Sequence, residues 1–103
     1  MNIILISNYA KRSECMYRVK MTQALDFVKV RNGEIDYWHG DCAKTEWGEG
    51  CAEGRRRASD LVGFMQNQND PSLMNRVGKA IVGSGKYGAV ETGFFQEIGN
   101  NLI

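Results

Sequence analysis

The sequence lacks two features of secreted and membrane proteins, a set of paired cysteines and a long apolar run. It contains one proline, three cysteines and one histidine in 103 residues. Three cysteines are too few, and odd in number, for a disulfide framework, so they favour a reducing compartment. No apolar run approaches the roughly 20 residues of a membrane-spanning helix, and the run Ile3–Ile6 is too short for a signal-peptide core. We therefore expect a soluble, cytoplasmic protein that has no membrane partner.

The sequence also lacks an excess of either charge, with 13 basic and 12 acidic residues. Such a balance gives no overall field to draw the chain onto nucleic acid. The densest basic cluster is Arg55, Arg56 and Arg57. Three successive helical residues spread over about 200° of the circumference and would mostly face solvent, where Glu49 and Glu53 can pair with them. We therefore do not expect nucleic-acid binding.

Length and composition favour one folded domain over residues 1–103. The chain is 43% hydrophobic and 24% charged, which is ordinary for a globular protein, and its length matches one domain of common size. The patterns described below predict an α+β fold. We expect a β-rich part over residues 1–40, with a small antiparallel sheet or hairpin, and a three-helix part over residues 45–103.

The clearest local pattern is the dipeptide Asn32-Gly33. Both residue types tolerate a positive φ, which a two-residue type I′ hairpin turn requires. Folding the chain there places Val30 opposite Ile35 and charged residues opposite partners of the other sign. The sequence therefore predicts an antiparallel hairpin with strands over residues 27–31 and 34–38.

The residues before the hairpin fit two structures. Apolar residues at every second position favour a half-buried strand: Tyr17, Val19 and Met21. The apolar residues from Met21 to Val28 also fit helical spacing, so a helix over residues 14–25 stays open. Further upstream, residues 2–7 read as a more buried strand.

Helical spacing governs the second half of the chain. An apolar stripe from Trp47 to Met65 predicts a helix over residues 45–67, with Thr45 as its N-cap. Asp70-Pro71 is a standard start for a second helix, which Gly83 or Gly85 would end. A third helix follows, with apolar residues four apart: Val90, Phe94, Ile98 and Leu102.

The string Gly83–Gly88, followed by Val90, matches the spacing of the dinucleotide-binding fingerprint and of the kinase glycine loop. Both motifs need a strand before the loop and most of a domain behind it. Here the preceding segment is a predicted helix. We therefore expect a turn between two helices that binds no nucleotide. Phosphate binding at the start of the third helix, assisted by Lys86, is the weaker alternative.

Potential metal ligands or thiol chemistry centre on His39, Cys42 and Cys51, with Cys15 as a fourth potential ligand. Asp36 or Asp41 could orient the imidazole of His39. Structural zinc sites usually show paired short spacings, and here only the His39–Cys42 spacing is short. We therefore assign no metal, cofactor or catalytic residue, and keep a metal-binding or thiol-dependent module as the alternative function.

The preferred function is binding to another protein, as a regulator or inhibitor without enzymatic activity. Two tryptophans, four tyrosines, four phenylalanines and five methionines are types favoured at interfaces. Glycines on the first helix would let another backbone approach, and adjacent phenylalanines on the third cannot both face one core, because neighbouring positions lie about 100° apart. We expect a two-fold homodimer through these candidates: Trp47, Gly50, Gly54, Phe94 and Phe95.

Overall fold

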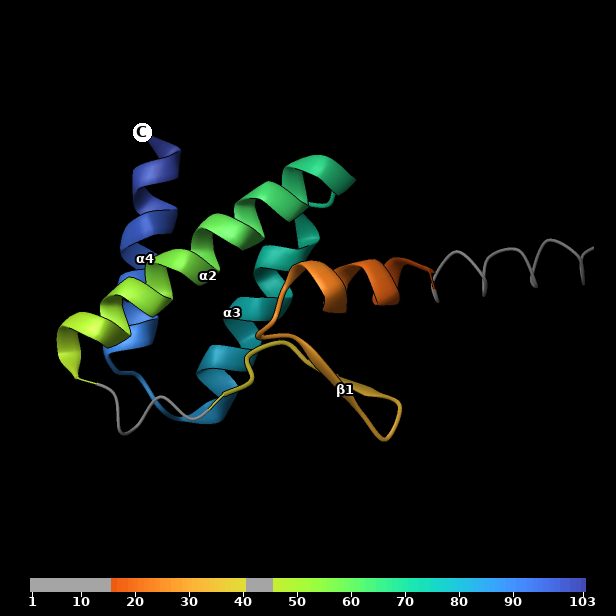
Figure 1. The fold of residues 1–103 in the computed structure, drawn as a ribbon, viewed down its shortest axis with the longest axis horizontal. Coiled ribbons are helices and arrows are strands. Elements are labelled where there is room, and N and C mark those ends of the chain that lie inside the picture. Colours follow the sequence, from red (N-terminus) through yellow and green to blue (C-terminus); the bar gives the residue numbers. More distant parts are fainter. Residues whose placement is uncertain (1–15, 41–45) are drawn as a thin grey trace, which may run out of the picture.

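The computed structural model describes residues 16–40 and 46–103 (Figure 1). The predicted α+β class is confirmed: a two-stranded antiparallel hairpin precedes three helices. The elements are β1 (Lys29–Arg31), β2 (Glu34–Asp36), α2 (Trp47–Gln68), α3 (Ser72–Ser84) and α4 (Ala89–Leu102). Within the described ranges, no helix is both long and apolar enough to cross a membrane. The strand expected over residues 2–7 lies outside the described residues.

Residues 16–24 form a helix ahead of the hairpin. The strand interpretation of Tyr17, Val19 and Met21 is therefore wrong, and the helical alternative is confirmed. Met21 and Leu25 are almost completely buried, whereas Val19 is 48% exposed. Burial thus follows the four-residue helical step instead of the two-residue step of a strand.

The hairpin has the predicted register. Val30 pairs with Ile35, and Asn32 and Gly33 have φ angles of 52° and 81°, as the primed turn requires. The ladder is shorter than predicted, with three residues in each strand. It stops before Val28, because the backbone N–H of Val28 donates to the carbonyl of Leu25 in a local turn instead of to the other strand.

The link between α2 and α3 is anchored by Asp70. The carboxylate Oδ1 of Asp70 accepts hydrogen bonds from the backbone N–H of Ser72 at 3.1 Å and from its hydroxyl at 2.5 Å. The N-cap of α3 is Pro71, one residue later than the predicted cap Asp70, and Asp70 holds the first residue of the helix through these bonds. Its other oxygen accepts a 2.5 Å hydrogen bond from the hydroxyl of Tyr17. This contact ties the 16–24 helix to the link between α2 and α3.

The other helix ends follow the sequence closely. Glu46 is the N-cap of α2, and the predicted cap, Thr45, lies outside the described residues. Gly85 ends α3 with a φ of 69°, which confirms one of the two predicted stops. Gly83 and Ser84 are the last residues of α3, and residues 85–88 connect it to α4, so the predicted turn between two helices is confirmed.

The main core lies between the 16–24 helix, the base of the hairpin, α2 and α3. Its buried members are Met21, Leu25, Phe27, Val28, Ala58, Leu61, Phe64, Leu73, Val77, Ile81 and Phe94. Three of them, Leu73, Val77 and Ile81, recur every fourth residue of α3 and give that helix its buried face.

Helices α2 and α4 cross with their backbones in contact (Figure 1). A Cβ atom on Gly54 would overlap the carbonyl oxygen of Val90, and one on Gly93 would overlap the carbonyl oxygen of Cys51. Only glycine allows this approach. The notch that the sequence shows on the first long helix is therefore filled by α4 of the same chain.

We expect Gly54→Ala to lower the free energy of unfolding by about 1 to 3 kcal/mol or more, because the added methyl group must push two backbones apart. Gly63→Ala is the matched control. Gly63 lies on the same helix with open space around it, so alanine there should raise stability by up to about 1 kcal/mol through helix propensity. Urea denaturation checks both values. Equal effects of the two substitutions would contradict the close crossing.

The contact between Tyr17 and Asp70 predicts a loss of stability at alkaline pH. Burial, followed by the hydrogen bond to Asp70, raises the pKa of Tyr17 from 10.0 to about 12. A raised pKa in the folded state gives stability that is complete below pH 10 and is lost as the pH rises through about 12. Tyr17→Phe should therefore be less stable than wild type at neutral pH, and the difference should shrink as the pH rises.

The contact between Tyr17 and Asp70 also predicts a loss of stability at acidic pH. The hydrogen bonds from Ser72 and Tyr17 lower the pKa of Asp70, so its contribution is present above the ordinary carboxyl pKa and fades as the pH falls below it. Denaturation curves of wild type and Tyr17→Phe across pH test both the alkaline and the acidic loss of stability, with Tyr87→Phe as an exposed control. A constant difference between wild type and Tyr17→Phe would refute the assignment.

Candidate functional site

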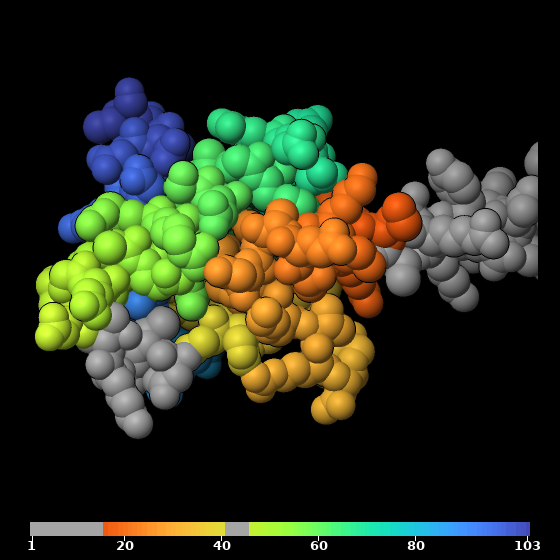
Figure 2. Space-filling model, viewed as in Figure 1, coloured from red at the N-terminus to blue at the C-terminus, as the bar shows by residue number. Residues whose placement is uncertain are grey.

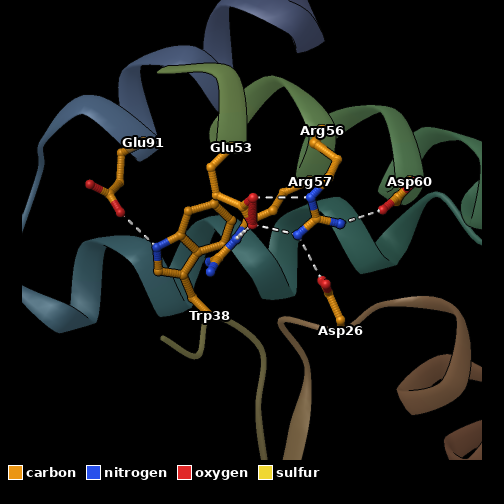
Figure 3. Close-up of polar contacts among 7 residues, drawn as sticks. All are labelled: Asp26, Trp38, Glu53, Arg56, Arg57, Asp60 and Glu91. Carbon is orange, nitrogen blue, oxygen red and sulfur yellow. Dashed lines mark hydrogen bonds and ion pairs between the residues drawn. The ribbon is translucent and has the colours of Figure 1, made fainter. Parts of the chain in front are cut away.

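Trp38 lies where the end of the hairpin meets α2 and α4 (Figure 3). Its ring packs edge-to-face on Phe94 at 4.9 Å and on Phe27 at 5.6 Å between centroids. Its indole N–H donates a 2.8 Å hydrogen bond to Oε2 of Glu91. An indole N–H needs such a partner when its ring is packed away from water. Trp38 therefore fixes the hairpin to α4 by packing and by a directed bond.

Glu91 has a second partner at the start of α4. Its other oxygen, Oε1, accepts a 2.7 Å hydrogen bond from the backbone N–H of Gly88, and the residue is 7% exposed. A carboxylate is favoured at this end of a helix because the helix dipole is positive there. The protein's own carboxylate thus takes up an amide that a bound phosphate would use, which weighs against the phosphate alternative.

Arg57 is buried against two aromatic rings. The central carbon of its guanidinium lies 4.8 Å from the ring centroid of Trp38 and 5.3 Å from that of Phe27, and its Nε donates to Glu53 at 3.2 Å. The expectation that the three arginines mostly face solvent is therefore wrong for Arg57. The hairpin covers this side of α2, and aromatic faces there take the place of water around the cation.

Arg56 holds an ion-pair network on the outer side of α2 (Figure 3). Its guanidinium bonds Asp60 at 2.9 Å, Asp26 at 3.0 Å and Glu53. The adjacent guanidinium lowers the pKa of Glu53, and the carboxylates raise the pKa of Arg56. Two arginines of the basic cluster, buried Arg57 and exposed Arg56, are therefore paired with acidic residues of the same chain, which does not favour a nucleic-acid surface.

A cleft of about 710 Å³ separates the end of the hairpin from the α3–α4 turn. Its lining includes Asp36, His39, Lys86 and Tyr87. The Nδ1 atom of His39 lies 3.1 Å from Oδ2 of Asp36, and Nη2 of Arg31 lies within 3.2 Å of both ring nitrogens. The polar groups of His39 and Asp36 are thus engaged with one another and with Arg31.

The three potential metal or thiol residues fall in different places. His39 lines the cleft, Cys51 is buried on α2 beside Gly93, and Cys42 lies outside the described residues, as do Cys15 and Asp41. Across residues 16–40 and 46–103, no three histidine, cysteine or acidic side chains gather in a way that could hold a metal ion. A metal or thiol site that includes Cys42 therefore stays a prediction.

The five interface candidates divide into two groups. Gly50 and Gly54 pack against α4, and Phe94 is completely buried, so these three are covered by the chain itself. Trp47 is 64% exposed and Phe95 is 36% exposed. One of the adjacent phenylalanines does turn away from the core, as their spacing predicts, and Phe95 is the one that does.

An apolar stripe runs along the outer side of α4. Three of its members face outward, Phe95, Leu102 and Tyr87 before the helix, and the fourth, Ile98, is partly buried and packs against the core. The ring of Tyr87 stacks on Phe95 with centroids 6.1 Å apart and planes 12° apart, and Leu102 is 79% exposed. We call these four residues the α4 stripe.

The surface around the α4 stripe has no exposed charge within α4. Its exposed polar side chains are amides: Gln96, Asn100 and Asn101. The two charged residues of the helix are Glu91, which is buried, and Glu97, which is partly buried. Sequence reasoning missed this feature, although the lack of lysine and arginine after Lys86 could have indicated it.

We expect Arg57→Met to lower the free energy of unfolding by about 1 to 3 kcal/mol, because a hydrogen bond to a charged group and two contacts with aromatic faces are lost. The exposed neighbour Arg55 provides the control, since Arg55→Met should change stability by no more than about 0.5 kcal/mol. Denaturation followed by tryptophan fluorescence measures both. Similar values for the two variants would show that the aromatic cage of Arg57 contributes little.

Comparison with known proteins adds no relative: no protein-family model, curated protein or solved structure matches this chain.

Proposed function

We propose that this chain acts by binding another protein, as a small regulator or inhibitor without catalytic activity, and that the α4 stripe is the binding surface. The observation that carries the proposal is the exposure of Tyr87, Phe95 and Leu102 beside a helix whose own exposed side chains are uncharged; Lys86, next to Tyr87, is an exposed charge at the edge of this row. Depletion of charge together with exposed aromatic residues is the composition that distinguishes the centre of protein interfaces. A continuous apolar row on a helix is also the form in which helices bind grooves and other helices.

The state of the polar groups supports binding over catalysis. The imidazole of His39 contacts Asp36 and Arg31, and both oxygens of Glu91 accept hydrogen bonds within the chain. A general acid or base needs a free position for the proton that it transfers. The alternative metal or thiol module has less support, because Cys51 is buried and His39 is engaged.

The cytoplasm is the compartment that we propose for this activity. The support is the sparse and odd set of cysteines, which fits a reducing environment. Cys51 is a buried free thiol, and such a residue behaves as a small apolar side chain.

The proposal predicts that changes to the α4 stripe remove a partner without unfolding the protein. We would compare capture from the native host by wild type and by Tyr87→Ser/Leu102→Ser, with quantification by mass spectrometry. Both residues are mostly exposed, at 64% and 79%, so stability should change little. The proteins that wild type retains should be lost from the double variant.

The matched control is Val19→Ser/Val30→Ser, which removes two apolar residues of 48% and 47% exposure from the 16–24 helix and β1. This variant should retain the partners of wild type. Thermal melts of all three proteins establish that they are folded. Equal capture by both double variants, or loss from the control alone, would refute the α4 stripe as the binding surface.

A further inference from the structure

We propose that the α4 stripe pairs with the same stripe of a second copy of this chain, α4 against α4 about a two-fold axis. This inference rests on the proposed function and names its partner. It places the dimer contact on Tyr87, Phe95, Ile98 and Leu102, instead of on the buried glycines of α2.

The first argument is self-complementarity. At a two-fold interface, the same patch of both subunits must match itself, so a patch with charges of one sign repels its copy. The exposed side chains of α4 carry no charge. Its amides, Gln96 and Asn100, each present a donor and an acceptor, so each can bond to the same residue type in another copy.

The 16–24 helix and α3 both carry exposed charges. The exposed residues of the 16–24 helix include Arg18 and Lys20, and those of α3 include Arg76 and Lys79. Arg76 and Lys79 lie three residues apart and share a face of α3, so a copy of that face would meet them with two more positive charges. The α4 surface is therefore better suited to pair with itself than this face of α3.

The second argument is the glycine on the outer side of α4. Gly99 is exposed, one turn after Phe95, and a Cβ atom built on it meets nothing within 4 Å. A neighbouring helix can therefore approach its backbone closely. The crossing at Gly93 shows that α4 already packs in this way against α2. Gly99 lies about 120° around the helix from Gly93, so both contacts can form together.

The third argument is access. Figures 1 and 2 show the C-terminal turns of α4 extending past α2 at the edge of the molecule. Leu102 there is 79% exposed and Asn100 is also exposed. In this view, no described segment covers these turns, so a second helix can lie along them.

The size of the surface sets the expected strength. Helix α4 has 14 residues and is about 21 Å long. One helix face of that length is smaller than the roughly 800 Å² that each partner contributes to a standard interface. We therefore expect a reversible dimer with a dissociation constant in the micromolar range.

Sedimentation equilibrium of the full chain tests this pairing. The mass should lie near 11.6 kDa in dilute solution and approach twice that value at concentrations of roughly 0.5 mM. A monomer mass over the whole range, or masses above a dimer, would overturn the two-fold pairing.

Charge substitutions at Gly99 locate the contact. Gly99→Glu and Gly99→Lys should each weaken self-association by roughly ten-fold or more, because like charges then face each other across the axis. A mixture of the two variants should associate again. The control is Gly63→Glu, at an exposed glycine of α2 with open space around it, and it should dimerise as wild type does. A dimer that Gly99→Glu does not weaken would place the contact on another face.

The capture experiment separates this inference from the proposed function. A chain that stays monomeric, yet loses its captured partners in Tyr87→Ser/Leu102→Ser, binds a different protein through the α4 stripe, so only the pairing fails. A chain that stays monomeric and whose captured partners do not depend on the stripe contradicts both proposals.

Discussion

The backbone contact between α2 and α4 is the constraint on which the rest of the structure depends. Because Gly54 and Gly93 have no side chains, the two helices touch where other residues would hold them apart. That approach places the first turns of α4 beside the end of the hairpin, so that Glu91 reaches the indole of Trp38. A two-stranded hairpin is at best marginally stable alone. Here it is held by a residue that the helix crossing brings into position.

The polar groups of this region are arranged to support the packing. Arg57 is a buried cation, and a buried charge is tolerated only when partners replace its water. Glu53 and the ring faces of Trp38 and Phe27 do so. Glu91 serves the start of α4 and the indole together. Among the described residues, these central charged groups are engaged in packing, and this is why the proposed function is placed on the outer surface.

The sequence predicts the parts of the fold that local rules decide. Asn32-Gly33 fixes the register of the hairpin, and Asp70-Pro71 and Gly85 mark helix ends, because turn and cap conformations depend on adjacent residues. Residues 16–24 fit two periods, and only burial against the core decides between them. The bond between Trp38 and Glu91 joins residues 53 apart, so no local pattern can indicate it. The glycine notch predicts that a backbone approaches, but not that the backbone belongs to α4 of the same chain.

The candidate site lies on the side of α4 that faces away from its crossing with α2. Gly93 and Phe94 face inward, and a helix whose opposite side met only water would be expected to carry charged residues there. In α4 that side instead carries Phe95, Leu102 and amides. Nothing in the folding of the described residues requires this, since Leu102 is mostly exposed and contributes little burial. The proposed function accounts for this row as a binding surface, because a neutral face that contains a glycine meets the steric and electrostatic conditions for packing against another helix.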